Sequence, residues 1–339
     1  SANWFGAASL IRPCQRVCNM DFRFAKQRAG LDVTAPDFQH SSCRMKRNNN
    51  LSLPAKAECV RASAPENSHP FRGACVLTLG LSLLAAWLCG ACKPLDASRS
   101  SASPFSQPPR KLLFVGDSFT YYNGGLDNHV TQLANAACPP RSIVADRATK
   151  GGAPLKKLYG LQWVHDKIHD GGYDAVILQD DIPEYREHSS APFFEYGRLF
   201  DREIRNAGGR TVLLMAWPYE RLNWASQSEI AQAHRDLGRE LRAPVAPVGL
   251  AFQRALAERP ALAMLGPDKE HESIHGTYLA ANVIYAALFA ESPEGFKYYP
   301  AGISAEEAAF LQRIAWQTVQ TWRTQLEQGR KLRSAGVVQ

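Results

Sequence analysis

From residue 110 onward, short uninterrupted apolar runs alternate with longer segments whose apolar residues recur every three or four positions. The short runs are rich in Val, Leu and Ile, which is typical of strands that are buried on both faces of a sheet. They predict strands at 111–115, 142–145, 175–178, 211–216 and 245–248. The helical spacing predicts helices at 126–137, 155–168, 193–205, 226–241, 276–289 and 305–326.

This alternation indicates an α/β fold with three layers, because helices provide the crossover connections between parallel strands. We expect about five parallel strands with helices on both faces, forming one domain over residues 110–330. In an open sheet of this kind, ligands bind beyond the carboxyl ends of the strands. The residues that follow the predicted strands are therefore the first candidates for a functional site.

Residues 74–91 form an apolar run without charge, preceded by Arg72 and followed by Cys92. The length of the run and the small residues near Cys92 are typical of the core and cleavage region of a signal peptide. We assign residues 71–92 to a signal peptide or lipoprotein-type anchor. Three outcomes stay open: lipidation of Cys92, plain secretory cleavage, or an uncleaved membrane anchor. Each predicts a bacterial protein that is secreted, periplasmic or held at the cell surface.

The segment ahead of this run, residues 1–70, shows no sustained apolar periodicity. A signal peptide normally lies near the start of a protein, so a long segment ahead of one is unusual. We expect residues 1–70 to be unstructured or not part of the mature protein, with Met20 and Met45 as alternative translation starts. Residues 93–109 are rich in Ser and Pro and predict a linker.

Charge is unevenly distributed along the 339 residues, which carry 39 Lys and Arg, 32 Asp and Glu, and a formal net charge of +7. Residues 1–92 carry 11 Lys and Arg against 5 Asp and Glu, whereas residues 93–339 carry 28 against 27. The predicted domain therefore has no basic excess suited to a phosphate backbone, and we expect no nucleic-acid partner. Its sequence shows no clustered metal-ligand motif, so we expect neither a metal nor another cofactor. We expect a monomer.

The first predicted strand stops at a Gly-Asp-Ser turn, residues 116–118. One explanation is an ordinary turn in which Asp117 or Ser118 caps the next helix. The alternative is a nucleophile at the strand end, and a serine hydroxyl then needs a base and a carboxylate that orients the base. Asp268 and His271, three residues apart on a loop before an apolar helix, have the residue types for that pair. The same loop is also compatible with helix capping by solvated charges.

These motifs, in this order, resemble those of the SGNH (GDSL-type) serine hydrolases, in a bacterial secreted or lipoprotein branch. The resemblance covers roughly residues 110–290 and implies a flavodoxin-like SGNH hydrolase fold. It implies that Ser118 is the nucleophile, with His271 as the base and Asp268 as the orienting carboxylate. It also implies that the backbone amides of Ser118 and Gly152 form part of an oxyanion hole.

The chain departs from that family at its third motif. The family has Gly-x-Asn-Asp there, and its Asn side chain completes the oxyanion hole, whereas this chain reads Leu-Gln-Asp-Asp over residues 178–181. Gln179 carries the same amide donor on a longer side chain, and we expect it to replace the Asn. Five further residues near strand ends are expected to contact substrate, with capping or packing as the alternative for each: Asp117, Tyr121, Tyr122, Asp180 and Trp217.

The predicted function is hydrolysis of carboxylic esters by acyl transfer through Ser118, His271 and Asp268. We expect a small-molecule or polysaccharide ester as substrate, with deacetylation of a carbohydrate or cell-envelope polymer as the leading interpretation. Two alternatives stay open. One is a lipase or broad acyl esterase, and the other is a non-catalytic envelope binding protein that has retained the fold.

Overall fold

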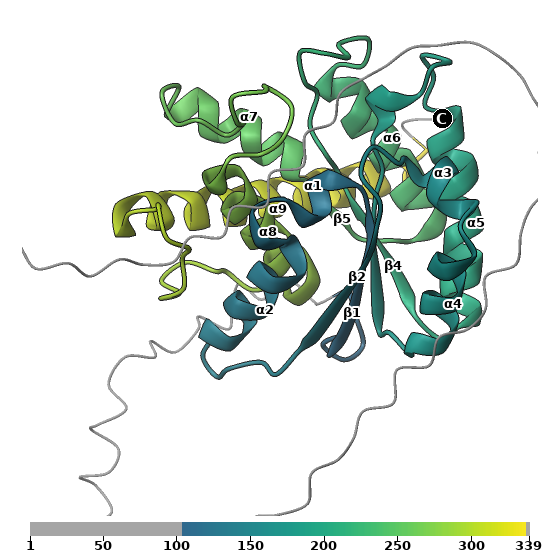
Figure 1. Ribbon diagram of the computed structural model, residues 1–339, viewed down its shortest axis with the longest axis horizontal. Coiled ribbons are helices and arrows are strands. Elements are labelled where there is room, and N and C mark those ends of the chain that lie inside the picture. The colour runs from purple at the N-terminus through teal and green to yellow at the C-terminus, as the bar shows by residue number, and fades with distance from the viewer. Residues whose placement is uncertain (1–103, 337–339) are drawn as a thin grey trace, which may run out of the picture. The chain divides into compact units, whose positions relative to one another are not determined.

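The computed structural model describes residues 104–336. The predictions for residues 1–70 and 71–92, and most of the predicted linker, lie outside the described residues. Within the described part, no helix has the length and hydrophobicity needed to cross a bilayer. Strands and helices alternate through most of this part, and the chain ends with two long helices (Figure 1).

The centre of the fold is a sheet of five parallel strands in the order β2-β1-β3-β4-β5, which confirms the predicted fold class. The strands are β1 (Lys111–Gly116), β2 (Val144–Thr149), β3 (Ala175–Gln179), β4 (Arg210–Leu214) and β5 (Val245–Ala246). Strand β1 lies between β2 and β3, with Val115 opposite Leu178. The residues that follow β1 and β3 therefore leave the sheet side by side at its carboxyl edge.

Helices cover both faces of the sheet (Figure 1). One face carries α2 (Leu126–Ala136), α7 (Val248–Glu258), α8 (Ile274–Phe289) and α9 (Ala305–Ser334). The other carries α3 (Leu155–Tyr159), α4 (Gln162–Gly171), α5 (Ala191–Asn206) and α6 (Gln227–Leu241). Successive side chains of a strand point to opposite faces, so Leu112 and Phe114 pack against the first group and Leu113 and Val115 against the second. Three short helical turns complete the carboxyl edge: α1 (Ser118–Tyr121), η2 (Tyr122–Gly124) and η3 (Ile182–Glu184).

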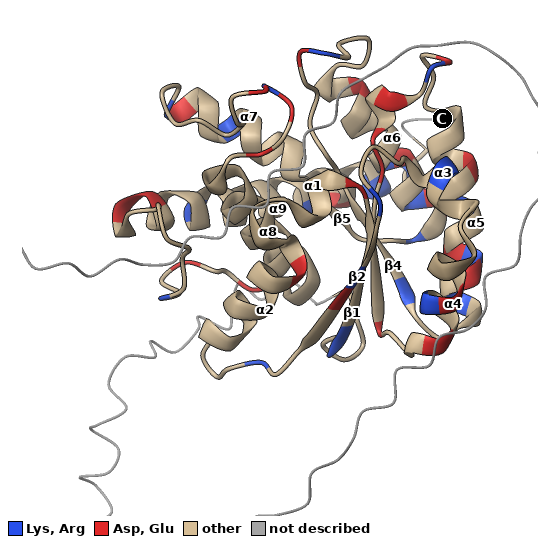
Figure 2. Cartoon of the chain, viewed as in Figure 1, with Lys and Arg blue, Asp and Glu red and all other residues tan. Residues whose placement is uncertain are grey.

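Charged residues of both signs are interspersed on the surface helices, as α4 and α5 show (Figure 2). One exposed ion pair joins Arg198 of α5 to Glu240 of α6 through two hydrogen bonds of 2.6 and 2.9 Å. The guanidinium of Arg198 also lies over the ring of Phe194. Both residues lie within helices and not in the loops at the carboxyl edge of the sheet. The pair therefore provides a control for an ion pair described below.

The second strand lies later in the chain than its apolar pattern predicts, at Val144–Thr149 rather than 142–145. The strand is at the edge of the sheet, so its polar side chains reach partners beside it. Asp146 accepts from Lys167 at 2.9 Å, and Arg147 pairs with Asp127 at 3.2 Å. Charged residues in an edge strand interrupt the apolar run from which the prediction was made.

The helices also differ from the prediction in three places. Helix α9 continues to Ser334, beyond the predicted end at residue 326. The single helix predicted at 155–168 is two helices, α3 and α4, separated by Gly160 and Leu161. Helix α7 was not predicted at all, because only Pro247 separates it from β5 and the two read as one apolar run. This run supplies a two-residue strand and a helix instead of the strand expected at 245–248.

Candidate active site

Ser118 is the first residue of α1, directly after the turn that ends β1. Asp117 caps this short helix, since its Oδ1 accepts from the backbone N–H of Phe119 at 3.1 Å. The amide of Ser118 is at the helix N-terminus, where no intrahelical partner exists. Within the described residues no other hydrogen bond occupies it. The turn therefore presents both a hydroxyl and a free N–H at the carboxyl edge of the sheet.

His271 and Asp268 lie in hydrogen-bond contact with this serine. Ser118 Oγ is 2.8 Å from His271 Nε2, and His271 Nδ1 is 2.8 Å from Asp268 Oδ2. The other carboxylate oxygen, Asp268 Oδ1, accepts from the backbone N–H groups of Glu270 and His271 at 3.1 and 3.0 Å. The hydrogen bond from His271 lowers the pKa of Asp268 below its usual value. Asp268 thus orients the imidazole and closes the loop that carries it.

Two aromatic rings contact the imidazole of His271. Tyr122 stacks on it with ring centroids 4.6 Å apart and an interplanar angle of 18°, and Phe119 meets it edge-on at 5.6 Å. The segment that follows Tyr122 is tied to the same loop, because Asn123 Nδ2 donates to the carbonyl oxygen of Glu272 at 2.8 Å. The base is therefore held on two sides as well as by its carboxylate.

This arrangement can move a proton from the serine hydroxyl to the imidazole. A hydroxyl whose proton passes to a neighbouring base becomes a nucleophile, and a carboxylate behind the base stabilises the imidazolium that results. Among residues 104–336 no cluster of three His, Cys, Asp or Glu side chains has the geometry to hold a metal ion. The chemistry that this site can perform is nucleophilic attack followed by general acid–base transfer.

Gln179 lies directly beneath the serine turn. Its Oε1 accepts from the backbone N–H of Asp117 at 2.7 Å and from the hydroxyl of Thr120 at 3.0 Å. A backbone N–H only donates, so the carbonyl oxygen of the Gln179 amide must face Asp117 and the amide nitrogen must face away. Gln179 Nε2 is buried and has no hydrogen-bond partner within the described part of the chain. A buried donor without a partner thus lies beside the serine turn.

Gly152 follows β2, the strand next to β1, and has a φ of +57°. The loop approaches α1, since a Cβ on Gly151 would lie 2.8 Å from the hydroxyl of Tyr121. The loop is also anchored to the end of β3, because Asp180 Oδ1 accepts from the backbone N–H of Leu155 at 2.9 Å. No hydrogen bond among the described residues occupies the Gly152 amide. These contacts place the two predicted amide donors, Gly152 and Ser118, on adjacent loops.

Three aspartates at this edge are buried, and burial raises the pKa of each. The pKa of Asp117 rises to about 7 and that of Asp180 to about 6. The pKa of Asp181 is raised as well, first by burial and then by the charge of Asp117. Asp180 also accepts from the Tyr185 hydroxyl at 2.6 Å. The geometry favours capping and anchoring for Asp117 and Asp180, the alternative that the sequence left open.

The predicted aromatic contacts differ in exposure. Tyr122 is 41% exposed and lies at the mouth of the site, whereas Trp217 is only 2% exposed. The ring of Trp217 stacks on Phe252 at 4.4 Å and lies 4.7 Å from Phe119. Its Nε1 donates to the carbonyl oxygen of Glu270 at 3.0 Å. This geometry favours packing for Trp217, whereas Tyr122 is exposed and Tyr121 is half-buried.

Glu272 was not predicted as a site residue, because it stands among other charged residues of a loop in the sequence. It is 1% exposed, and neither carboxyl oxygen has a hydrogen-bond partner in the part of the chain that the structure describes. Burial raises the pKa of Glu272 to about 8, and the charge of Asp117 adds to the rise. An isolated antiparallel bridge pairs Glu272 with Leu265 within the same loop. The residue types around Glu272 did not indicate its burial.

Comparison with solved structures identifies the fold. A DUF4886 family protein from Bacteroides uniformis is 15% identical over 62% of this chain and 95% of its own, with a TM-score of 0.51. A candidate SGNH hydrolase from Slackia heliotrinireducens is 19% identical over 52% and 98%, with a TM-score of 0.44. A lipase/acylhydrolase from Enterococcus faecalis is 17% identical over 53% and 96%, with a TM-score of 0.45.

No protein-family model matches the chain, and no curated protein matches it in sequence. At these identities the likeness to solved structures shows the fold alone. The α/β/α fold implied by the resemblance to the SGNH hydrolases is thereby confirmed.

Proposed function

We propose that this protein is a serine ester hydrolase, with Ser118 as nucleophile, His271 as general base and Asp268 as the carboxylate that orients the base. The observation that carries the proposal is the unbroken hydrogen-bond chain through these three residues, with 2.8 Å at each step. It stands at the carboxyl edge of a parallel sheet, where folds of this kind bind ligands.

In the proposed reaction, His271 Nε2 accepts the proton of Ser118 as Oγ attacks the ester carbonyl carbon. The carbonyl oxygen becomes an oxyanion that accepts from the amides of Ser118 and Gly152 and from Gln179 Nε2. Asp268 stabilises the imidazolium, which then donates its proton to the departing alcohol. Water, deprotonated by His271, attacks the acyl-enzyme, releases the acid and restores Ser118.

Hydrolysis of p-nitrophenyl acetate by the full chain tests this proposal. Ser118→Ala and His271→Ala are each expected to lower kcat by several orders of magnitude, and Thr131→Ala, on α2, is expected to leave it unchanged. Equal rates for the wild type and Ser118→Ala would refute the nucleophile. A wild type inactive on every ester would favour the non-catalytic binding protein instead.

We propose an acetylated carbohydrate or cell-envelope polymer as the substrate class. The support is the exposed ring of Tyr122, which stacks on His271 at the mouth of the site. An exposed aromatic face beside the base suits the apolar face of a sugar ring. Tyr122→Ala is expected to raise KM for an acetylated oligosaccharide several-fold and to leave KM for p-nitrophenyl acetate within twofold. An equal rise for both esters would contradict the sugar-stacking role.

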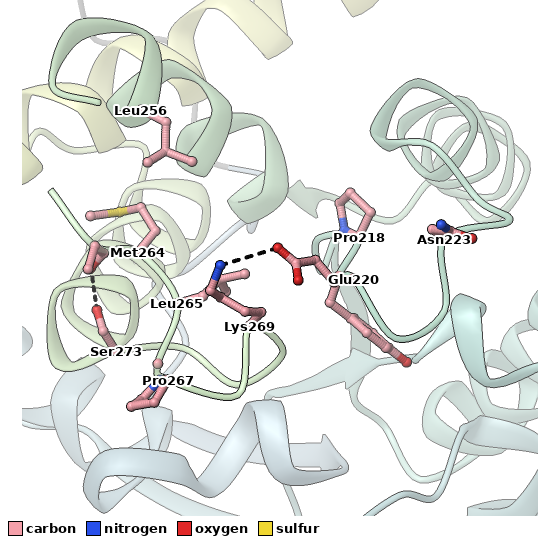
Figure 3. A pocket seen from close by; sticks show the side chains of 12 residues that line it. Pro218, Glu220, Asn223, Leu256, Met264, Leu265, Pro267, Lys269 and Ser273 are labelled. Atoms are coloured by element: carbon pink, nitrogen blue, oxygen red, sulfur yellow. Dashed lines mark hydrogen bonds and ion pairs between the residues drawn. The ribbon is translucent and has the colours of Figure 1, made fainter. Parts of the chain in front are cut away.

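A second candidate, hydrolysis of longer acyl esters, is favoured by a separate cavity of about 970 Å³. It lies between the segment after β4 and the loop that carries Asp268, and its walls are mostly apolar. In Figure 3, Leu256 and Met264 lie on one side, and Pro218 and Asn223 on the other. A volume of this size accommodates an acyl chain of medium length.

The ratio of octanoate to acetate hydrolysis separates the two substrate classes. Leu256 lines the cavity and is 40% exposed, so Leu256→Trp fills the cavity without disturbing the core. If the cavity takes the acyl chain, Leu256→Trp lowers the rate on p-nitrophenyl octanoate and leaves the acetate rate unchanged. Leu332→Trp, at a 47% exposed position of α9, is the matched control. An unchanged ratio in Leu256→Trp would rule the cavity out as the acyl site.

We also propose that the protein acts outside the cytoplasm of a bacterium as a monomer. The support is the sequence of residues 71–92, with Cys92 as the residue that carries a lipid if the segment is a lipoprotein signal. Cell fractionation of the wild type and Cys92→Ala tests the anchor. Release of the variant from the membrane fraction supports lipidation, and equal partitioning of both forms contradicts it.

A further inference from the structure

The proposed base and its carboxylate lie on a surface loop. The side chain of Asp268 is 47% exposed, so it is not held in place by burial. The next residue, Lys269, has a φ of +58°, a left-handed conformation that is unfavourable for a non-glycine residue. A loop with an exposed carboxylate and a strained residue needs contacts from elsewhere to keep one geometry.

Those contacts come from the segment that follows β4. Arg221 donates to Glu270 through two hydrogen bonds, from Nε and Nη2 to the two carboxylate oxygens, each at 2.7 Å. Trp217 Nε1 donates to the Glu270 carbonyl oxygen at 3.0 Å. Lys269 pairs with Glu220 at 3.3 Å, across the cavity drawn in Figure 3. Glu270 lies between Asp268 and His271, so each contact bears on the loop that carries the pair.

Arg221 also reaches a third segment of the carboxyl edge. Its Nη2 donates to Glu184 of η3, the turn that follows the end of β3. Glu184 is five residues beyond Gln179, the proposed oxyanion donor. The guanidinium lies over the ring of Tyr219, whose hydroxyl donates to Asp181. One side chain therefore links the loops after β3 and β4 to the loop of the base.

Each of these contacts contributes little to folding stability, but together they restrict the position of the loop that carries His271. An exposed ion pair contributes little to folding stability, but a planar bidentate pair fixes direction as well as distance. Glu270 is partly sheltered, with 17% of its side chain exposed. A displacement of about 1 Å between reacting groups can lower a rate about 100-fold. The contribution of Arg221 is therefore expected in catalysis more than in folding.

We propose that Arg221 is a positioning residue of the active site, which holds the loop through Glu270 so that His271 stays within hydrogen-bond reach of Ser118. The inference rests on the proposed ester hydrolase function. Arg221 acts through the loop and contacts none of the three residues of the hydrogen-bond chain. Both ion-pair partners of Arg221, Glu184 and Glu270, are carboxylates, so its positive charge is paired within the protein.

Steady-state kinetics on p-nitrophenyl acetate provide the first test. Arg221→Ala is expected to lower kcat about 10- to 100-fold and to leave KM within about twofold of the wild type. Arg221→Lys retains the positive charge but not the planar guanidinium that makes two hydrogen bonds, so it is expected to recover part of the lost kcat. The matched control is Arg198→Ala. It removes a bidentate pair whose arginine is similarly exposed, at 44% against 51% for Arg221, and also lies over an aromatic ring, although Glu240 is more exposed than Glu270. Equal kcat for Arg221→Ala and Arg198→Ala would overturn the proposal.

A double-mutant cycle tests whether Arg221 acts through Glu270. If it does, the combined variant Arg221→Ala and Glu270→Ala loses little more activity than either single variant. Additive losses would show that the two residues act independently. Urea unfolding of all variants separates this effect from instability, because a positioning role predicts a large change in kcat with little change in the unfolding midpoint.

A readout without substrate distinguishes failure of this inference from failure of the proposed function. The imidazole nitrogen shifts of His271, read by NMR through its non-exchanging ring protons, report which nitrogen carries the proton. The wild type and Arg198→Ala are expected to hold it on Nδ1, and Arg221→Ala to show a mixture of tautomers. Identical spectra in all three would overturn the positioning role even if the enzyme is active. A wild type without esterase activity would refute the proposed function while this comparison still decides whether Arg221 orders the loop.

Discussion

Gln179 Oε1 lies 2.7 Å from the backbone nitrogen of Asp117, so the last residue of β3 holds the turn that presents Ser118. The same bond determines the direction of the Gln179 amide, because its oxygen must face the N–H donor. Gln179 Nε2 then remains a buried donor without a partner among the described residues. One side chain thereby joins a structural role in the turn to a proposed role in binding the oxyanion.

Removal of this donor is expected to slow the reaction without abolishing it. Gln179→Glu keeps an acceptor for the Asp117 amide but replaces the amide nitrogen with a carboxyl oxygen. If Gln179 Nε2 binds the oxyanion, kcat on p-nitrophenyl acetate falls about 100- to 1000-fold. Thr120→Val is the control, since it removes the other hydrogen bond to Gln179 Oε1 and leaves Nε2 in place. A loss in Thr120→Val as large as that in Gln179→Glu would assign Gln179 to the turn alone.

Gly116 is required by the close approach of β1 to Gln179. A Cβ at this position would lie 2.3 Å from Gln179 Oε1 and 2.4 Å from Thr120 Oγ1. Gly116→Ala is therefore expected to destabilise the fold by roughly 1–3 kcal/mol and to displace the serine turn. Urea unfolding and kcat measure the two effects. In contrast, Gly160→Ala, with no contact closer than 3.5 Å, should change neither, and a similar loss there would contradict the account.

The buried carboxyl of Glu272 predicts a dependence of stability on pH. Its pKa is raised from 4.5 to about 8 in the folded state, so between these values folding takes up a proton. Stability therefore falls as pH rises from about 4.5 to about 8, and the loss is complete above that pH. Each unit of pKa corresponds to about 1.4 kcal/mol. Glu272→Gln removes this dependence and should be more stable than the wild type at pH 9 but not at pH 4.

Urea unfolding at the two pH values checks this prediction. The control is Glu240→Gln, because the hydrogen bond from Arg198 lowers the pKa of Glu240, the opposite direction. The other buried carboxyls are present in both proteins, so the difference between wild type and Glu272→Gln isolates one group. Parallel stability curves for the two proteins would show that Glu272 is not a buried proton-binding group.

The three residues of the proposed hydrogen-bond chain were predictable from residue type and order. The α/β pattern places Ser118 at the carboxyl edge of the sheet, and the resemblance to the SGNH hydrolases implied Asp268 and His271 as its partners. The position of Gln179 followed in the same way, since it ends the strand beside β1. Each of these residues sits next to an element that the hydrophobic pattern predicts.

The remaining features depend on contacts between distant segments. Nothing near Arg221 in the sequence indicates that it pairs with Glu270 and Glu184, and the charged residues around Glu272 do not indicate that it is buried. For Trp217 the sequence left substrate contact and packing as alternatives. The contact with Phe252 favours packing, and it comes from α7, a helix that was not predicted.

The most direct test of the central claim is covalent labelling of the nucleophile. The full chain is incubated with an alkyl fluorophosphonate, which reacts with serines activated by a neighbouring base, and the modified peptide is located by mass spectrometry. The account predicts one adduct, on Ser118, with loss of esterase activity in proportion to labelling and no adduct in Ser118→Ala. An active enzyme that gains no adduct on Ser118, or that is labelled equally in Ser118→Ala, would contradict the assignment of Ser118 as nucleophile.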